Sequence, residues 1–325
     1  MATNLFLCVL DMSRTASLVI LFVMALRLPL KRLPKAFSYG LWSVVLFRLL
    51  CPVSFERPFG LLPAESRLLL PQGLTAGAAP MGQDAVPLLP AQAAAGISHS
   101  GAWLPLAAWL WVGGAAVFLI YNLAALIRLR RKLVGAVRVR ANVYLADGIA
   151  TPFVMGVFRP RIYLPSGIEA EDRRFVELHE EMHLRYGHHI AKLIASAALA
   201  LHWFNPLVWA SFFLAGRDME MMCDEGVLRH AGGDVRRRYA QTILRLAVGK
   251  RRVVTLPVAF GEGDAGARVK NILSCHKIAA WAGVPIAVLL VLIGLGLLCD
   301  PPGGQREYIQ FPAYPGEETE YNAHV

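Results

Sequence analysis

Four runs of apolar residues, each long enough to cross a bilayer as a helix, constrain this 325-residue chain more than any other feature. A membrane-spanning helix needs about 20 residues, because the hydrocarbon core is ~30 Å thick. The chain is 56% hydrophobic and 17% charged, whereas roughly a quarter of the residues in a soluble domain are charged. The runs cover residues 5–26, 37–55, 102–127 and 278–299. We therefore expect a mainly α-helical membrane protein with four transmembrane helices.

The lysine and arginine residues predict the orientation of these helices. They cluster after the first and third runs and before the fourth, whereas residues 54–101 and the tail are poor in them. Because basic loops stay on the cytoplasmic side, the amino terminus is predicted outside. The net charge of +10 is explained by these flanks, and no nucleic-acid recognition motif accompanies it. The predicted parts are two helices with a basic link (1–55), an external flexible linker (56–101), the third helix (102–127), a cytoplasmic domain (128–277), the fourth helix (278–299) and a short external tail (300–325).

A fifth apolar run, residues 193–216, contains no charged residue. A single crossing here would place the basic clusters on both sides of the membrane, against the positive-inside pattern. Asn205-Pro206 lies near its middle, and such a pair favours a turn. We expect a helical hairpin, either buried in the cytoplasmic domain or dipping into the inner leaflet, that does not cross.

The segment ELHEEMHLRYGHH, residues 177–189, contains the zinc signature H-E-x-x-H. On a helix, His179 and His183 are four residues apart and project from nearly the same face. Neutral imidazoles bind Zn²⁺ well and leave a position open for water. Glu180 is the carboxylate that can reach this water, so we predict that it is the catalytic base.

The third zinc ligand has two candidates in the sequence. His189 is where metzincins place their third histidine, but the glycine that should turn the chain is one place late, at Gly187. We expect the helix to continue, which would leave His188 and His189 on the surface. Glu220 follows the apolar hairpin on a segment that can fold back onto the first helix, and Asp224 is one turn further on. We favour Glu220 as the third ligand and Asp224 as a residue that orients a histidine ring, with His189 as the weaker candidate.

These motifs together resemble a known family. H-E-x-x-H, WFNPLVW at 203–209, RDMEMMCDEGVL at 217–228 and TPFVMGVFRPRIYLP at 151–165 resemble the integral-membrane metallopeptidases of the β-lactam sensor-transducer (antirepressor) family. The resemblance implies a bacterial inner-membrane protein whose cytoplasmic α+β, zincin-like domain is a zinc endopeptidase. Such a protein would respond to an external signal by cutting itself and a cytoplasmic repressor. His179, His183 and Glu220 would then bind zinc, with Glu180 as the base.

The same resemblance raises a possible role for the strand segment at 151–165. A strand beside a zinc helix can hold a peptide substrate by edge pairing. Phe153 and Gly156 are the residues of this segment that we predict to lie on such a substrate-binding strand. An ordinary core strand is the equally weighted alternative. His230 is a weak candidate for assisting an oxyanion.

The chain also departs from the best-known family members. No S-x-x-K motif follows the fourth apolar run, so β-lactam sensing by acylation is not expected of this chain, and a separate sensor protein is a possible partner. The sequence does not indicate an oligomeric state. Two alternatives to a regulatory protease stay open: a housekeeping membrane protease, and a non-catalytic signalling or scaffold protein that keeps the fold.

Overall fold

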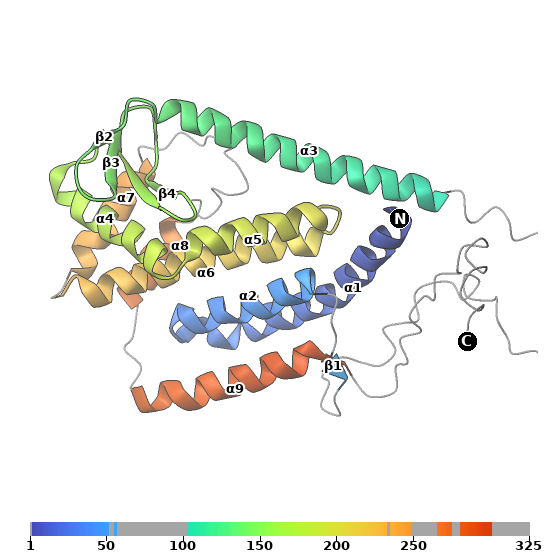
Figure 1. The fold of residues 1–325 in the computed structure, drawn as a ribbon. Helices are drawn as coiled ribbons and strands as arrows, with labels where there is room; N and C mark the ends of the chain where they lie inside the picture. The colour runs from blue at the N-terminus through green and yellow to red at the C-terminus, as the bar shows by residue number, and fades with distance from the viewer. Residues whose placement is uncertain are drawn as a thin grey trace, which may run out of the picture.

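The computed structural model describes residues 2–51, 55–56, 103–232, 235–248, 265–274 and 280–300, which form long helices and a small mixed sheet (Figure 1). The helices are α1 (Ala2–Leu26), the short 3₁₀ helix η1 (Pro29–Arg32), α2 (Lys35–Leu50), α3 (Trp103–Lys132), α4 (Ala170–Arg185), α5 (His188–Leu201), α6 (Pro206–His230), α7 (Arg236–Val248), α8 (Ala265–Ser274) and α9 (Ala280–Leu298). The strands are β1 (Phe55–Glu56), β2 (Val137–Arg138), β3 (Val143–Ala146), β4 (Phe153–Met155), β5 (Arg161–Pro165) and β6 (Cys299–Asp300).

Two of the described helices, α1 and α3, are long and apolar enough to cross a membrane by length and composition. The other predicted spans form α2, with 16 residues, and α9, with 19 residues. At about 1.5 Å per residue, α2 is near 24 Å long, shorter than a ~30 Å hydrocarbon core. The structure thus has two candidate membrane helices, and the four-helix topology stays a prediction. Most of the predicted external linker (56–101) and tail (300–325) lies outside the described residues.

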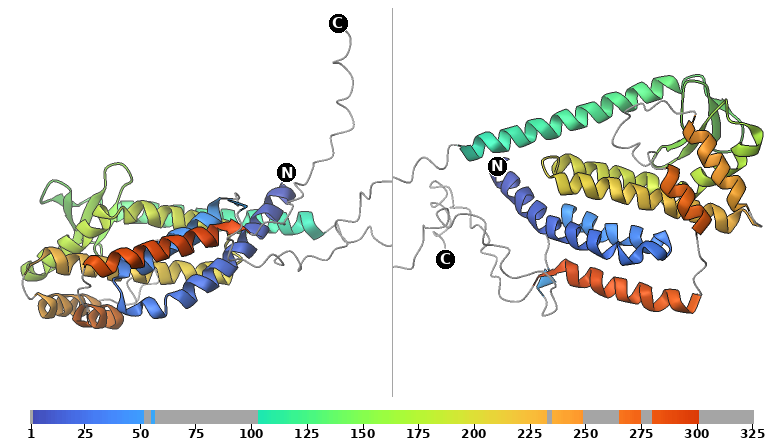
Figure 2. Two further views of the ribbon diagram at one scale, coloured as in Figure 1. Left: turned by 90° about the horizontal axis from the view of Figure 1, so that it is seen from below. Right: turned by 180° about the vertical axis from the view of Figure 1, so that it is seen from behind.

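The long helices lie side by side, with the sheet, α4, α7 and α8 gathered at one end of them (Figures 1 and 2). The start of α1, the start of α3 and the end of α9 all lie at the opposite end. There, β1 pairs in parallel with β6, so that Phe55 is opposite Cys299. This pairing holds the residues that follow α2 and α9 on the same side of the helices.

The fifth apolar run lies in two consecutive helices, α5 and α6, which together extend beyond the run at both ends. Asn205 caps the second helix by accepting a hydrogen bond from the Leu207 N–H at 2.9 Å, and Pro206 occupies its first turn. Such residues favour a helix start because the first N–H groups lack partners in the helix. The helix α6 then continues past Gly216 to His230. The segment 217–230, which carries Glu220 and was expected to fold back onto the first helix, is therefore the second half of α6.

The tip of this hairpin lies among the long helices and is held by hydrogen bonds. The Asn205 amide donates to the hydroxyl oxygens of Ser13 and Ser17, both at 2.8 Å. Trp111 of α3 donates its indole N–H to the Leu201 carbonyl at 2.8 Å. Trp203 in turn donates to the Trp111 carbonyl at 3.2 Å. Interhelical hydrogen bonds of this kind contribute to helix association in lipid, where the hydrophobic effect does not drive helices together.

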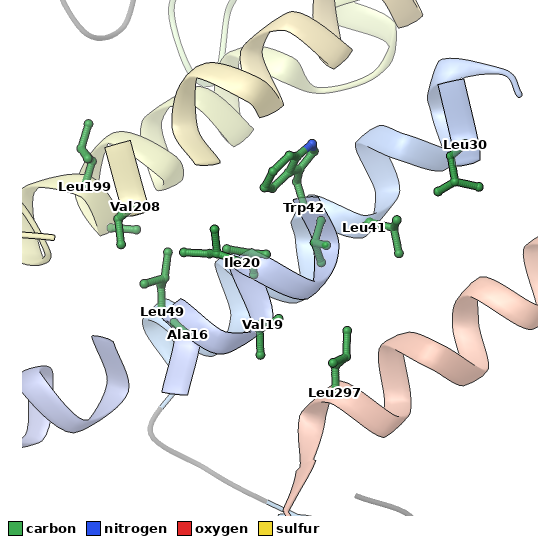
Figure 3. Close-up of a cluster of buried hydrophobic side chains, with 13 residues drawn as sticks. Ala16, Val19, Ile20, Leu30, Leu41, Trp42, Leu49, Leu199, Val208 and Leu297 are labelled. Carbon is green, nitrogen blue, oxygen red and sulfur yellow. The ribbon is translucent and has the colours of Figure 1, made fainter. Parts of the chain in front are cut away.

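An apolar cluster fills the space between the hairpin, α1, α2 and α9 (Figure 3). Packed methyl and aromatic groups gain dispersion contacts that a cavity would forfeit. The hairpin is therefore an integral part of the helical bundle. The members labelled in Figure 3 are Ala16, Val19, Ile20, Leu30, Leu41, Trp42, Leu49, Leu199, Val208 and Leu297.

The sheet has the strand order β2-β3-β5-β4, with β3 and β5 parallel and the outer pairs antiparallel. The segment 151–165, expected to be one strand, is instead two antiparallel strands with Phe153 opposite Tyr163. Gly156 explains the turn, because its φ is +111° and an added Cβ would lie 2.7 Å from the Arg159 carbonyl oxygen. The backbone conformation of this turn therefore accounts for a glycine at position 156 without any role in substrate binding. The edge strand β4 contacts α4.

Candidate metal centre

The helix α4 carries His179, Glu180 and His183, and all three are buried, with 6% of each residue exposed. Glu171 and Asp172 lie in its first turn, where negative charge is favourable for a helix. The helix was expected to continue through Gly187, but it ends at Arg185. Gly187 has a φ of +67° and is the residue that precedes α5. Glycine adopts this left-handed conformation at little cost because it has no Cβ.

This turn also corrects the predicted surface position of the histidines that follow. His188 is fully buried, with none of its surface exposed. His189 is half-buried and lies outside the group of possible metal ligands in the described residues. The late glycine therefore redirects the chain so that His188, and not His189, returns to the site.

The helix α6 packs against α4 and brings Glu220 to the two histidines. The Glu220 carboxylate lies 3.2 Å from His179 Nε2 and 3.5 Å from His183 Nε2, one oxygen facing each ring. Close packing at Gly226 permits this approach, since an added Cβ there would lie 2.9 Å from Met182 Sδ on α4. The candidate ligand atoms of His179, His183 and Glu220 all lie within 4.8 Å of one another.

The other ring nitrogen of His179 faces a buried polar network. His179 Nδ1 is 2.9 Å from the Tyr239 hydroxyl and 3.3 Å from Asp224 Oδ1. Tyr239 donates to Asp224 at 2.6 Å. Arg268 donates to both Asp224 oxygens, at 2.9 and 2.7 Å, and lies 3.4 Å from Glu220. Asp224 thus lies where a ring-orienting carboxylate would be placed.

The connection between α1 and α2 holds α6 from the opposite side. Asp218, which is 1% exposed, accepts two hydrogen bonds from the Arg27 guanidinium at 2.7 Å. The Trp42 indole donates to the same carboxylate at 3.0 Å. The Lys35 backbone N–H donates to Glu225 at 3.0 Å. The helix that carries Glu220 is therefore fixed to the first two long helices.

The charges of the site favour a cation between the histidines and Glu220. Burial would lower the pKa of His179, but hydrogen bonds to Asp224 and Glu220 outweigh it and raise the pKa to about 9. Burial opposes the charge of Glu220, yet His183, His179 and Arg268 hold its pKa well below the usual range. Burial lowers the pKa of His183, so that ring is neutral and can offer a lone pair. A metal ion would replace the proton at His179 Nε2.

The residues present fit a zinc ion by donor type. Two imidazole nitrogens and one carboxylate are a known catalytic zinc set, with a fourth position left for water. A second group, His183, His188 and Cys223, also brings three possible ligand atoms together. Burial, with Glu220 and Asp224 nearby, raises the pKa of the Cys223 thiol well above its usual value, so without a metal this group holds a neutral thiol.

His230 and Phe153, the remaining sequence candidates, have other contacts in the structure. His230 is at the exposed end of α6, where it contacts Arg185 and its Nδ1 lies 2.8 Å from the Gly226 carbonyl. Phe153 stacks on Tyr163 with ring centroids 5.6 Å apart. Neither residue is among the possible metal ligands of the described part of the chain.

Sequence reasoning missed three residues that touch the predicted ligands: His188, Tyr239 and Arg268. Arg268 was counted only among the basic residues that flank the fourth apolar run, yet its side chain is 13% exposed and pairs with Asp224. Tyr239 follows the run of arginines at 236–238, which gives no sign of a buried hydroxyl. Both come from helices, α7 and α8, whose packing on α4 and α6 is set by tertiary contacts.

A helix with two histidines and a buried glutamate, completed by a carboxylate from a second helix, defines the class of H-E-x-x-H metallopeptidases. Comparison of the sequence with known families agrees, because the family described as BlaR1 peptidase M56 matches residues 7–272. The chain belongs to this family.

Curated relatives match a smaller part of the chain. The regulatory protein BlaR1 of Bacillus licheniformis is 30% identical over 126 residues, which are 38% of this chain and 21% of that protein. The methicillin resistance mecR1 proteins of Staphylococcus aureus and Staphylococcus epidermidis are each 26% identical over 113 residues, 34% of this chain and 19% of theirs. The matched parts thus span about a fifth of the length of these relatives.

Proposed function

We propose that this chain is a membrane-embedded zinc endopeptidase that transduces a signal by cutting itself and a cytoplasmic transcriptional repressor. The observation that carries the proposal is the approach of the Glu220 carboxylate to both His179 Nε2 and His183 Nε2, at 3.2 and 3.5 Å. Glu180 is buried, lies on the same helix, and stands between the two histidines in the sequence. Membership of the BlaR1 peptidase M56 family supports the peptidase class, and the regulatory role rests on the relatives' names.

His179, His183 and Glu220 would hold the zinc ion. When bound, zinc would acidify a water molecule and polarise the carbonyl of the peptide bond to be cut. The Glu180 carboxylate accepts the proton of the attacking water and returns it to the leaving amine. Asp224 and Tyr239 hold the His179 ring through Nδ1. Arg268 balances the two buried carboxylates, Glu220 and Asp224.

The proposed substrate path follows the edge strand. The strand β4 ends the sheet order and contacts α4, so an extended peptide paired with β4 would pass beside the zinc helix. Phe153 lies on this strand, and Gly156 follows it at the turn. An edge strand beside the helix that carries the metal ligands is the feature that we propose to be zincin-like.

The proposed topology has four membrane helices, with the amino terminus outside and the metal centre in the cytoplasm of a bacterial cell. The directions of α1, α2, α3 and α9 support it, because successive helices of this group run in alternating directions (Figure 1). The parallel pairing of β1 with β6 places the exits of α2 and α9 together. The partners would be the lipid bilayer, a repressor or other protein substrate, and a separate sensor protein.

Removal of the metal tests the proposal directly. We expect the purified full-length protein in lipid nanodiscs to cut itself or a co-purified repressor, and to lose this activity with a zinc chelator. Mass spectrometry of the fragments, before and after zinc is restored, is the measurement. Cleavage that survives chelation would contradict a metal-dependent peptidase. If the protein bound zinc but cleaved neither a repressor, nor itself, nor a peptide library, the scaffold alternative would be favoured. Cleavage of unrelated membrane proteins would favour the housekeeping protease.

A further inference from the structure

His188 is a fully buried histidine that contacts a predicted zinc ligand without belonging to the proposed ligand set. Its Nδ1 lies 3.1 Å from His183 Nδ1. The two rings meet edge to face, with centroids 5.2 Å apart and planes at 69°. This contact is on the side of His183 opposite to the Nε2 atom that faces Glu220.

The separation of the two Nδ1 atoms requires one hydrogen between them. A neutral imidazole carries a hydrogen on only one nitrogen. His183 Nε2 must be free of hydrogen to bind a metal, so the hydrogen of His183 is on Nδ1 and points to His188. His188 Nδ1 is then the acceptor, and the hydrogen of His188 is on its Nε2.

We propose that His188 is a positioning residue, which accepts the Nδ1 hydrogen of His183 and so fixes the tautomer and direction in which His183 Nε2 faces the metal. The inference rests on the proposed zinc site. It gives the two histidine ligands different supports: an anionic network of Asp224 and Tyr239 for His179, and a neutral imidazole for His183.

The surroundings of His188 hold its ring in place for this role. Tyr39 of α2 meets the ring at a centroid distance of 5.0 Å and 72°, and Tyr186 at 5.5 Å. The left-handed turn at Gly187 aims the residue back at α4. The Nε2 atom of His188 is buried and lacks a hydrogen-bond partner among the described residues.

Cys223 also approaches the acceptor atom, with its Sγ 3.3 Å from His188 Nδ1. A thiol is a weak donor and His188 Nδ1 has a single lone pair, so the imidazole N–H of His183, the stronger donor, takes it. The competing interpretation is a metal bound by His183, His188 and Cys223. The two interpretations differ in what Cys223 contributes, and variants of Cys223 and His188 separate them.

The test compares zinc affinities of full-length variants, measured by competition with a chromophoric chelator. His188→Leu removes the acceptor at similar volume and is expected to weaken zinc binding about 10–100-fold, as loss of a partner to a metal-bound histidine does. His188→Asn restores an acceptor near the position of Nδ1, and its affinity is expected within a few-fold of the wild type. Cys223→Ala is expected to leave the affinity unchanged. Thermal unfolding without metal checks that the variants are folded.

Cobalt substitution gives a second readout that a merely structural role would not move. We expect His188→Leu to alter the visible bands of bound Co²⁺, and His188→Asn to return them to the wild-type pattern. Equal affinities for the wild type and His188→Leu would overturn the inference, as would loss of a thiolate band together with weakened binding in Cys223→Ala. If His188→Leu does not fold, the inference would be overturned by a His188→Asn variant whose zinc affinity is as low as that of Glu220→Gln. Failure of Glu220→Gln to weaken binding would instead contradict the proposed function.

Discussion

Replacement of Glu180 by glutamine is expected to slow peptide-bond cleavage by a factor of about 10²–10⁴, the usual contribution of a general base. Glutamine keeps the size of the side chain and its buried position next to His179 and His183, but it cannot accept a proton from water. The ligand atoms are unchanged, so zinc content is expected to stay at the wild-type level. The rate of fragment formation, followed by mass spectrometry on protein in nanodiscs, measures the effect.

Glu181 provides a matched control for this experiment. It is the neighbouring glutamate on α4, but it is exposed. Glu181→Gln makes the same chemical change and is expected to leave the rate near that of the wild type. Equal rates in Glu180→Gln and the wild type would remove Glu180 from the proposed chemistry.

Replacement of Glu220 by glutamine is expected to weaken zinc binding by more than the roughly 10–100-fold that loss of an orienting partner causes. The reason is that the change removes a charged ligand and the negative charge that favours a cation at His179 Nε2. Competition with a chelator, at constant pH and salt, measures the dissociation constant. Arg268 keeps Asp224 as a partner in this variant, so the fold is expected to persist.

The same measurement has an internal comparison. Glu181→Gln removes one charge from the same domain without touching the site, and its dissociation constant is expected to match the wild type. If Glu220→Gln bound zinc as tightly as Glu181→Gln, Glu220 would not be a ligand. His189 would not become the alternative by default, since it lies outside the possible ligand groups of the described residues.

Much of the helical arrangement could be predicted because it depends on local sequence. The apolar runs predict long helices, and Asn205-Pro206 predicts the turn of the hairpin, where Asn205 caps α6. The sequence left two positions open for the hairpin, buried in the cytoplasmic domain or dipping into the inner leaflet, and its packing among the long helices depends on distant contacts. This packing depends on Asn205 meeting Ser13 and Ser17, and on Trp111 meeting Leu201, which are about 90 or more residues apart in sequence.

The candidate site shows the same division between local and distant information. The spacing of His179 and His183, and the position of Glu220 after a returning hairpin, made the central group predictable. The error at His188 came from the backbone at Gly187, since its left-handed conformation separates α4 from α5 where the sequence predicted one continuous helix. Arg268 could not be assigned, because a basic residue near an apolar run has the same sequence signature whether it is exposed or buried.

X-ray absorption at the zinc edge, on the full-length protein with one equivalent of zinc, is the most direct test of the proposed centre. Ligation by His179, His183, Glu220 and water predicts only nitrogen and oxygen neighbours, at about 2.0–2.2 Å. The signal of imidazole rings is expected to weaken in His179→Ala and His183→Ala. A sulfur neighbour at about 2.3 Å that disappears in Cys223→Ala would place the metal on His183, His188 and Cys223 instead, and would contradict the proposed centre.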